Sequence, residues 1–258
     1  MICSASTNTG MRRQENQDNY LLRKYSEKTI LCVVCDGMGG AKGGEEASRI
    51  AADAFVYTMT QFMKPYVNDK SKQVRTSDIK RALAKAVAVA NENVYEAAKK
   101  SDDHKNMGTT LVAALIIDKN LFAINVGDSR LYSVKRNNIK QITKDHSYVQ
   151  YLVDMGTMTK EEAENSTHKN IITRVVGTDT EVEGDIYTAK LEEGTFLLLC
   201  SDGLTNMIYD EDLRKIIANE RDPLKVDQVA LDTKVRRLIN TANRNGGSDN
   251  ITAVLVRI

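Results

Sequence analysis

TILCVVCDGMGGAKGG, residues 29–44, joins an apolar run to a glycine-rich segment and decides the fold. Residues 29–35 are mostly apolar and β-branched, which predicts a strand buried in a core. Residues 37–44 are rich in glycine and predict a turn. The next residues, 45–63, carry apolar side chains spaced for one face of a helix. Asp36 therefore stands where a buried strand gives way to a turn.

Further strands and helices are grouped in blocks around this stretch. Strands are predicted at residues 2–6, 19–24, 111–117, 121–126, 130–135, 139–142, 184–189, 195–201 and 250–257. Helices are predicted at residues 78–99, with Ser77 as the N-cap, and at residues 211–219 and 225–242. Strands grouped between two pairs of helices predict an α+β layered domain, and the pattern leaves the strand order open.

The chain is predicted to form a single domain over residues 1–258, because no repeat, low-complexity tract or Pro/Gly linker divides it. Residues 145–177 are helical in places, polar, and without a strong apolar stripe. We expect this segment to be an insert that lies over the main body.

Composition narrows the possible partners. A hydrophobic content of 41% fits a globular protein, and a net charge of +1 gives no overall field that would gather nucleic acid or anionic lipid. No run of about 18 apolar residues occurs, and residues 1–10 lack the apolar core of a signal peptide. We therefore predict no nucleic-acid partner, no membrane span and a cytoplasmic location.

Aspartates at the ends of predicted strands carry the strongest indication of chemistry. They are Asp18, Asp36, Asp128, Asp202 and Asp249. A carboxylate beside a buried strand is costly to desolvate unless it is paired or binds a cation. A site built from carboxylates, a backbone carbonyl and water suits Mg²⁺ or Mn²⁺, and two such ions can activate a water. A single Asp-Gly is usually only a turn, and Asp128 in Gly-Asp-Ser fits that interpretation better than the others do.

Two other interpretations of the opening stretch are disfavoured. Cys32 and Cys35 form a C-x-x-C, but residues three apart on a strand point to opposite faces, so buried thiols explain them better than a redox or zinc site does. The dinucleotide pattern G-x-G-x-x-G fails because Lys42 occupies its last position, and Asp36 lies where a pyrophosphate would approach.

Taken in order, six short motifs resemble those of the type-2C metal-dependent protein phosphatases, most closely the bacterial members. They are residues 13–18 (RQENQD), 36–40 (DGMGG), 107–110 (MGTT), 127–130 (GDSR), 201–203 (SDG) and 248–250 (SDN). The resemblance spans nearly the whole chain. It implies a β-sandwich of two antiparallel sheets flanked by pairs of helices, with a metal centre at one end and residues 145–177 as a flap beside it.

The resemblance also implies the residue roles. Asp36 bridges two Mn²⁺ or Mg²⁺ ions, and the Gly37 carbonyl touches one of them. Asp202 and Asp249 complete the other site, and Asp18 holds metal-bound water. Arg13 grips the substrate phosphate, for which a guanidinium fork is well shaped. Asp128, together with Asp202, binds a third ion.

The implied reaction is hydrolysis of phosphoserine and phosphothreonine by direct attack of a water that bridges two metal ions. No C-x₅-R signature of a cysteine phosphatase occurs. The implied partners are phosphorylated proteins and a serine/threonine protein kinase whose substrates the enzyme dephosphorylates, with the chain acting as a monomer. Two rivals are a catalytically silent module on the same fold, which would lack metal ligands, and a phosphatase dedicated to one regulatory protein.

The chain departs from the family pattern at two positions. Met38 stands where many eukaryotic relatives have a histidine that is proposed as the general acid, and methionine cannot donate that proton. Gln17 replaces an acidic residue of some relatives. His104, His146 and His168 are interpreted as surface or structural histidines, and Arg174 either orients the flap or is a solvated charge.

Overall fold

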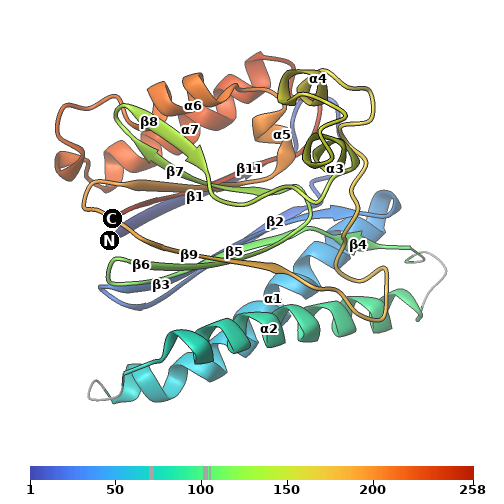
Figure 1. The fold of residues 1–258 in the computed structure, drawn as a ribbon, viewed down its shortest axis with the longest axis horizontal. Helices are drawn as coiled ribbons and strands as arrows, with labels where there is room; N and C mark the ends of the chain where they lie inside the picture. The colour runs from blue at the N-terminus through green and yellow to red at the C-terminus, as the bar shows by residue number, and fades with distance from the viewer. Residues whose placement is uncertain (70–72, 101–103, 105) are drawn as a thin grey trace.

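Two antiparallel β-sheets pack face to face in the computed structural model, which describes residues 1–69, 73–100, 104 and 106–258. Figure 1 shows the two sheets in the middle of the molecule, with helices above and below them. The first sheet has the order β1-β11-β10-β7-β8, and the second has the order β2-β3-β5-β6-β9, with β4 paired to the end of β3. Every strand pair is antiparallel.

The strand bounds lie close to the predicted ones. The first sheet contains β1 (Ile2–Asn8), β11 (Ile251–Arg257), β10 (Phe196–Cys200), β7 (Arg130–Lys135) and β8 (Asn138–Gln141). The second contains β2 (Asp18–Ser26), β3 (Thr29–Met38), β5 (Leu111–Ile117), β6 (Asn120–Val126), β9 (Asp185–Lys190) and the short β4 (Gly108–Thr109).

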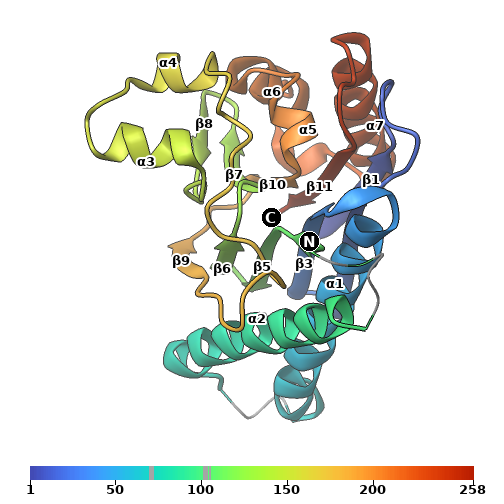
Figure 2. The ribbon, with the colours of Figure 1, turned by 90° about the vertical axis from the view of Figure 1, so that its right-hand side faces the viewer.

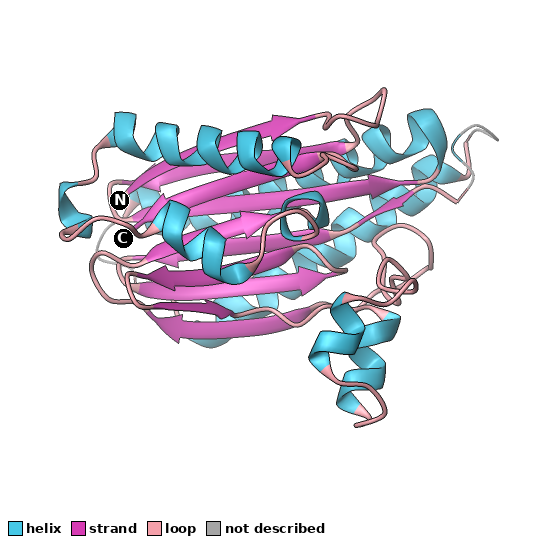
Figure 3. Ribbon diagram, turned by 90° about the horizontal axis from the view of Figure 1, so that it is seen from above, coloured by secondary structure: helices cyan, strands magenta, loops and turns pink. Residues whose placement is uncertain are grey.

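A pair of helices covers the outer face of each sheet. The helices α1 (Gly40–Asn68) and α2 (Thr76–Ala98) lie on the second sheet, and α6 (Asp210–Ile217) and α7 (Gln228–Arg244) lie on the first (Figures 1 and 3). A short α5 (Asp202–Thr205) follows β10, and a 3₁₀ turn, η2 (Pro223–Lys225), precedes α7. The predicted α+β sandwich with flanking helix pairs is confirmed. None of the described helices is both long and apolar enough to cross a membrane.

The alternation of side chains along β3 explains how one apolar run serves two cores. Leu31 and Val33 pack under α1 and α2, whereas Ile30 and Val34 lie between the sheets. Successive residues of a strand point to opposite faces, so a strand buried on both sides needs no polar alternation. Cys35 and Cys32 are divided in the same way between these two cores, and both thiols are free and buried. The geometry therefore agrees with the structural interpretation of the C-x-x-C.

The prediction of a turn over residues 37–44 is wrong for its second half. The helix α1 begins at Gly40, with Gly39 at its N-cap in a left-handed conformation, whereas a start near residue 45 was expected. Glycine is needed at position 44 for close packing, because a Cβ there would lie 2.9 Å from the Gly37 carbonyl carbon. Ser77 likewise lies inside α2 and does not cap it, because the N-cap is Arg75.

Residues 145–177 form a lobe beside the sandwich that carries α3 (Tyr148–Asp154) and α4 (Lys160–Glu164). Figure 2 shows both helices outside the two helix layers of the body. Two isolated bridges close the lobe at its base, Ser147 to Ile172 and Thr109 to Val176. Because α4 buries none of its residues and α3 buries only Val149, this lobe adds little to the core.

Candidate active site

The aspartates predicted from strand ends gather at one end of the sandwich. Asp18 and Asp36 lie directly opposite each other in the register of β2 and β3. Asp202 is the first residue of α5, after β10, and Asp249 lies just before β11, the neighbour of β10. Withdrawal from solvent raises the pKa of Asp36 well above its usual range, and the charges of Asp18, Asp202, Asp128 and Asp249 raise it further. The structure thus brings all five carboxylates into one electrostatic cluster.

The backbone around Asp36 is held by Thr109 and Thr110, which lie where β4 gives way to β5. The Thr110 N–H donates to the Asp36 carbonyl at 2.8 Å, and the Asp36 N–H donates to the Thr110 hydroxyl at 3.0 Å. The Thr109 hydroxyl donates to the same carbonyl at 2.9 Å. Asp36 lies inside β3 and does not end it, so its position is fixed by pairing with Asp18 of β2 on one side and by the bonds to Thr109 and Thr110 on the other.

Asp18 is buried and only half satisfied. The Ser201 hydroxyl donates to its Oδ2 at 2.6 Å, but Oδ1 is buried and has no hydrogen-bond partner in the described structure. Burial raises the pKa of Asp18 to about 6, and the charge of Asp202 adds to that shift. An unpaired carboxylate oxygen in a water-poor site is a position where a cation or a bound water would be stabilised.

Asp202 and Asp128 show the same environment. The Asn206 side-chain amide donates to Oδ2 of Asp202 at 3.0 Å, and withdrawal from solvent, followed by the charge of Asp249, raises the pKa of Asp202. Asp128 lies between β6 and β7, is buried, and leaves its Oδ1 without a hydrogen-bond partner among the described residues. Burial and then the charge of Asp202 raise its pKa well above the usual range.

Two glycines permit the close backbone packing that the cluster needs. A Cβ on Gly37 would lie 2.0 Å from the Gly44 carbonyl oxygen, and a Cβ on Gly203 would lie 2.0 Å from the Asn250 carbonyl oxygen. Only glycine lacks the atom that would collide. Gly203 therefore lets the turn that carries Asp202 pack against the turn that carries Asp249, and contact between the Gly37 carbonyl and a metal ion stays a prediction.

The chemistry of these groups fits hard divalent cations such as Mg²⁺ or Mn²⁺, which prefer oxygen donors. No three His, Cys, Asp or Glu side chains in the described ranges are gathered tightly enough to hold one ion as they stand. The fit therefore rests on the clustered carboxylates and on the two orphaned oxygens of Asp18 and Asp128. Such a cluster of mutually repelling carboxylates is stabilised by positive charge.

A groove of about 400 Å³ is bordered by the loop before β2 and by the start of α1. Its lining includes Arg13, Gln17, Gly37, Met38 and Asn250. Arg13 has a side chain that is 55% exposed, and its Nη2 donates to Oδ2 of Asp249 at 2.8 Å. That hydrogen bond, with the nearby carboxylates, raises the pKa of Arg13. An exposed guanidinium is suited to binding an anion such as a phosphate, and this role of Arg13 stays a prediction.

Several site residues were not singled out by sequence reasoning, although most belong to the same short motifs. Asn250 donates through its amide to the carbonyls of Thr9 and Glu15, each at 2.9 Å, and accepts from the Gln17 N–H at 2.8 Å. It therefore holds the loop that carries Arg13. Ser201, Asn206 and Thr110 orient the aspartates as described above. A search for polar side chains next to each aspartate would have found Ser201 and Asn250, whereas Thr110 lies in the motif at residues 107–110, which contains no aspartate.

The remaining predicted residues are spread more widely. Arg174 pairs with Asp185 at 2.8 Å, so it is not a lone solvated charge. His146 is buried at the root of the lobe, and burial lowers its pKa. His168 is exposed, with its ring edge-on to Tyr148. The side chain of Gln17 donates to the Gly40 carbonyl at 2.6 Å, so it ties the Arg13 loop to the start of α1.

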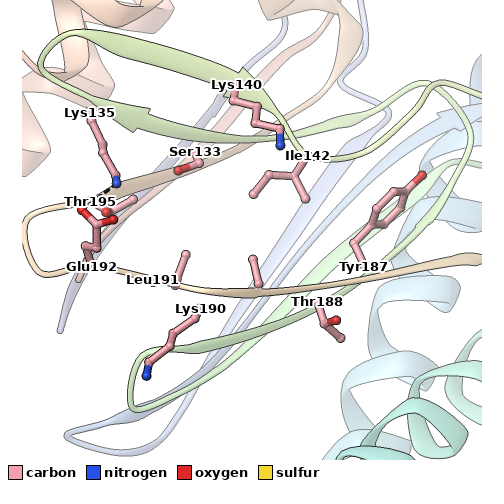
Figure 4. Close-up of a pocket in the computed structure, with 11 residues that line it drawn as sticks. Ser133, Lys135, Lys140, Ile142, Tyr187, Thr188, Lys190, Leu191, Glu192 and Thr195 are labelled. Carbon is pink, nitrogen blue, oxygen red and sulfur yellow. Dashed lines mark ion pairs between the residues drawn. The ribbon is translucent and has the colours of Figure 1, made fainter.

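A second hollow, of about 300 Å³, opens between the sheets where β8 and β9 form their outer edges. Figure 4 shows Lys135, Lys140 and Lys190 around it, with Ile142 and Leu191 among its apolar lining. Lys135 is paired with Glu192 at 2.8 Å. None of the five aspartates lines this hollow, so it is separate from the candidate active site.

Comparisons with known proteins agree with this arrangement. The family model described as protein phosphatase 2C matches residues 10–255. The chain is 34% identical over 250 residues to the serine/threonine phosphatase stp of Listeria innocua, covering 97% of this chain and 93% of that protein.

Two solved structures extend the match to the fold. The serine/threonine phosphatase Stp1 of Staphylococcus aureus superposes with a TM-score of 0.84 at 32% identity, covering 99% of this chain and 94% of that one. The catalytic domain of the serine/threonine protein phosphatase PstP, in complex with 2 manganese ions, superposes with a TM-score of 0.77 at 31% identity, covering 98% and 96%. The chain therefore belongs to the protein phosphatase 2C family.

Proposed function

We propose that this chain hydrolyses phosphoserine and phosphothreonine in proteins, and that its activity depends on Mn²⁺ or Mg²⁺ held by Asp36, Gly37, Asp202 and Asp249, with Asp18 and Asp128 contributing. The observation that carries the proposal is the cluster of five aspartates around Asp36, two of them with an orphaned buried oxygen, beside the exposed Arg13. Membership of the protein phosphatase 2C family and the manganese ions in the PstP relative support it.

When bound, the ions supply an activated water and positive charge that offsets the charge of the phosphate. The residues of the chain position the reactants. Arg13 would offer its guanidinium to the phosphate oxygens, and the free Oδ1 of Asp18 could accept a hydrogen bond that orients a water. Direct attack by water needs no phosphorylated enzyme, and the buried thiols Cys35 and Cys200, whose pKa values are raised by burial, are unsuited to nucleophilic attack.

The general acid for the leaving hydroxyl is not supplied by Met38, which lines the groove but carries no proton to donate. We propose that water fills this role. The rival of a catalytically silent module is disfavoured because Asp36, Asp202 and Asp249 are all present. A phosphatase dedicated to one regulatory protein stays an alternative, which a comparison of several phosphoproteins as substrates would decide.

We further propose that the chain acts as a monomer in the cytoplasm and reverses the action of a serine/threonine protein kinase. All four thiols are unpaired, which suits a reducing compartment. The named relatives are serine/threonine phosphatases. Size-exclusion chromatography with light scattering and cell fractionation test the first two points, and the phosphoproteome of a deletion strain tests the third.

The decisive experiment is hydrolysis of a phosphothreonine peptide by protein stripped with chelator, before and after Mn²⁺ or Mg²⁺ is restored. Activity is expected to vanish and to return. Asp36→Asn is expected to stay folded and to lose turnover, because one negative charge shared between two cations is removed. Full activity in excess chelator, or a near-normal kcat for Asp36→Asn at saturating Mn²⁺, would show that the metal assignment is wrong.

A further inference from the structure

The root of the lobe is bonded along its length to the turn that carries Asp128. The Ile142 N–H donates to the Leu131 carbonyl at 2.7 Å, and the His146 N–H donates to the Gly127 carbonyl at 2.9 Å. Between these two bonds, Arg130 forms an ion pair with Asp145 at 2.7 Å. The segment before α3 therefore runs alongside residues 127–131 and enters the lobe from there.

His146 bonds to Gly127 a second time, through its ring. The Gly127 N–H donates to Nδ1 of His146 at 3.1 Å, so one residue satisfies both the N–H and the carbonyl of Gly127. The His146 side chain is only 6% exposed. In this depth of burial, a backbone N–H without an acceptor is strongly unfavourable. Nδ1 is thus the acceptor, and a neutral ring carries its proton on Nε2.

Gly127 is in turn the residue that aims Asp128. It has a φ of +103°, and a Cβ there would lie 2.7 Å from Cβ of Thr110, so the turn is tight and tolerates only glycine. The Oδ1 atom of Asp128 is buried and has no hydrogen-bond partner of its own in the described structure. Apart from a hydrogen bond from its own backbone N–H, the direction of the carboxylate depends on the backbone turn, which His146 holds together with the Asn125 amide, a donor to the Gly127 carbonyl at 3.0 Å.

The other side of the ring faces the end of the lobe. The Nε2 atom of His146 lies 3.3 Å from Oδ2 of Asp185 and 3.3 Å from Nη1 of Arg174. Arg174 also donates to Oδ1 of Asp185 at 2.8 Å, and the Thr173 N–H donates to the His146 carbonyl at 2.8 Å. His146 therefore contacts the residues at which the chain leaves the lobe, as well as the turn before Asp128.

We propose that His146 is a positioning residue that fixes the Asp128 carboxylate for a third metal ion and ties that position to the base of the lobe. This inference rests on the proposed function, in which Asp128 is a metal ligand. His146 acts through the Gly127 peptide and touches neither substrate nor ion. The bond from Gly127 to Nδ1 is the essential contact, and the contacts of Nε2 with Asp185 and Arg174 keep the ring in place.

Two substitutions distinguish the contact made by Nδ1 from the contacts made by Nε2. In His146→Asn, the amide oxygen stands near the place of Nδ1 and still accepts the Gly127 N–H. In His146→Gln, the longer side chain reaches the place of Nε2 and leaves that N–H without an acceptor. Mn²⁺ alone is the probe: bound Mn²⁺ is measured by equilibrium dialysis of chelator-stripped protein, and kcat on a phosphothreonine peptide is measured across the same concentrations.

We expect wild-type protein to bind one more equivalent of Mn²⁺ than Asp128→Asn does. His146→Asn is expected to bind this ion as the wild type does, and His146→Gln to bind it about tenfold more weakly or worse. The kcat of His146→Gln is expected to recover at high Mn²⁺, because a weakened site is filled by mass action. His168→Gln is the matched control, since His168 is an exposed histidine of the same lobe, and it is expected to behave as the wild type.

The outcomes that overturn the inference differ from those that overturn the proposed function. If Asp128→Asn loses an ion and His146→Gln does not, the role of His146 is wrong while the third site stands. If the Asn and Gln variants lose stability and Mn²⁺ affinity equally, His146 is a packing residue only. If Asp128→Asn binds as much Mn²⁺ as the wild type, the third-ion assignment fails, and this inference fails with it.

Discussion

Arg13 and Asp249 meet in an ion pair at the edge of the groove, which joins two residues with different proposed roles. Both are only partly withdrawn from water, and such exposed pairs contribute little to stability. Their proximity matters more for the proposed function, because it places a guanidinium beside the proposed metal ligands, where a phosphate would enter.

Arg13→Ala is therefore expected to raise KM for phosphopeptides about ten- to hundredfold, since charge-assisted hydrogen bonds are worth about 1.5–3 kcal/mol. The melting temperature is expected to change little. Steady-state kinetics on a phosphothreonine peptide checks this, with Arg12→Ala as the control because Arg12 is an exposed neighbour on the same loop. If KM stayed normal and kcat fell sharply, Arg13 would be assigned to stabilising the transition state and not to binding the substrate.

The five aspartates and Arg13 could be found from the sequence because each lies in a short motif at the end of a predicted strand or beside one. His146 could not. Its role depends on a hydrogen bond to Gly127, 19 residues away, and no local pattern predicts which loop a buried histidine will meet. The orphaned oxygens of Asp18 and Asp128 also become visible only when burial is known.

At the level of the elements, the sequence predicted the strands of the sandwich well and the helix starts less well. Residues 130–135 were predicted as a strand and form β7 with the same bounds. Glycine propensity placed the start of α1 too late, because the helix begins at Gly40 and includes Gly44, which packs closely against Gly37. Strand order was out of reach, since β1 pairs with β11 across almost the entire chain.

The loop before β2 offers a test of how one element is held, because Asn250 supplies it with three hydrogen bonds. Asn250→Asp keeps the acceptor for the Gln17 N–H but sets a carboxylate oxygen against the carbonyls of Thr9 and Glu15. We expect a loss of about 2–4 kcal/mol in the free energy of unfolding and a higher KM, because Arg13 lies in this loop.

Urea unfolding and phosphopeptide kinetics measure these two effects. Asn243→Asp is the matched control, because its side chain bonds to Asn8 in a more exposed setting. If Asn250→Asp lowered stability no more than this control, the loop would be held by its backbone contacts and not by Asn250.

At the scale of the whole molecule, the sandwich gathers several buried carboxylates at one end, although burying like charges together is normally unfavourable. In the metal-free protein, burial raises the pKa of Asp18 to about 6, against about 3.9 for an unfolded aspartate. The folded state then binds a proton more tightly than the unfolded state does. The stability linked to Asp18 is therefore fully present below about pH 4 and is lost as the pH rises through 6.

We expect chelator-stripped protein to become less stable between pH 4 and pH 7, by at most about 3 kcal/mol from Asp18. Asp18→Asn removes this titration and is expected to flatten the dependence. Urea unfolding at several pH values measures it, and Asp212→Asn, at an exposed position in α6, is the control. An equal slope in the wild type and in Asp18→Asn would assign the pH dependence to other groups.

The hollow in Figure 4 has a consequence for solubility. It lies where β8 and β9 end their sheets, and within the described chain neither strand has a partner on its outer side. Open strand edges invite pairing with another molecule, and exposed lysines on an edge discourage that pairing through repulsion and hydration. Lys140 on β8 and Lys190 on β9 are exposed and stand at this margin. If these two side chains protect the sandwich from self-association, replacing both with threonine will leave kcat unchanged and hasten aggregation in light-scattering assays at 37 °C.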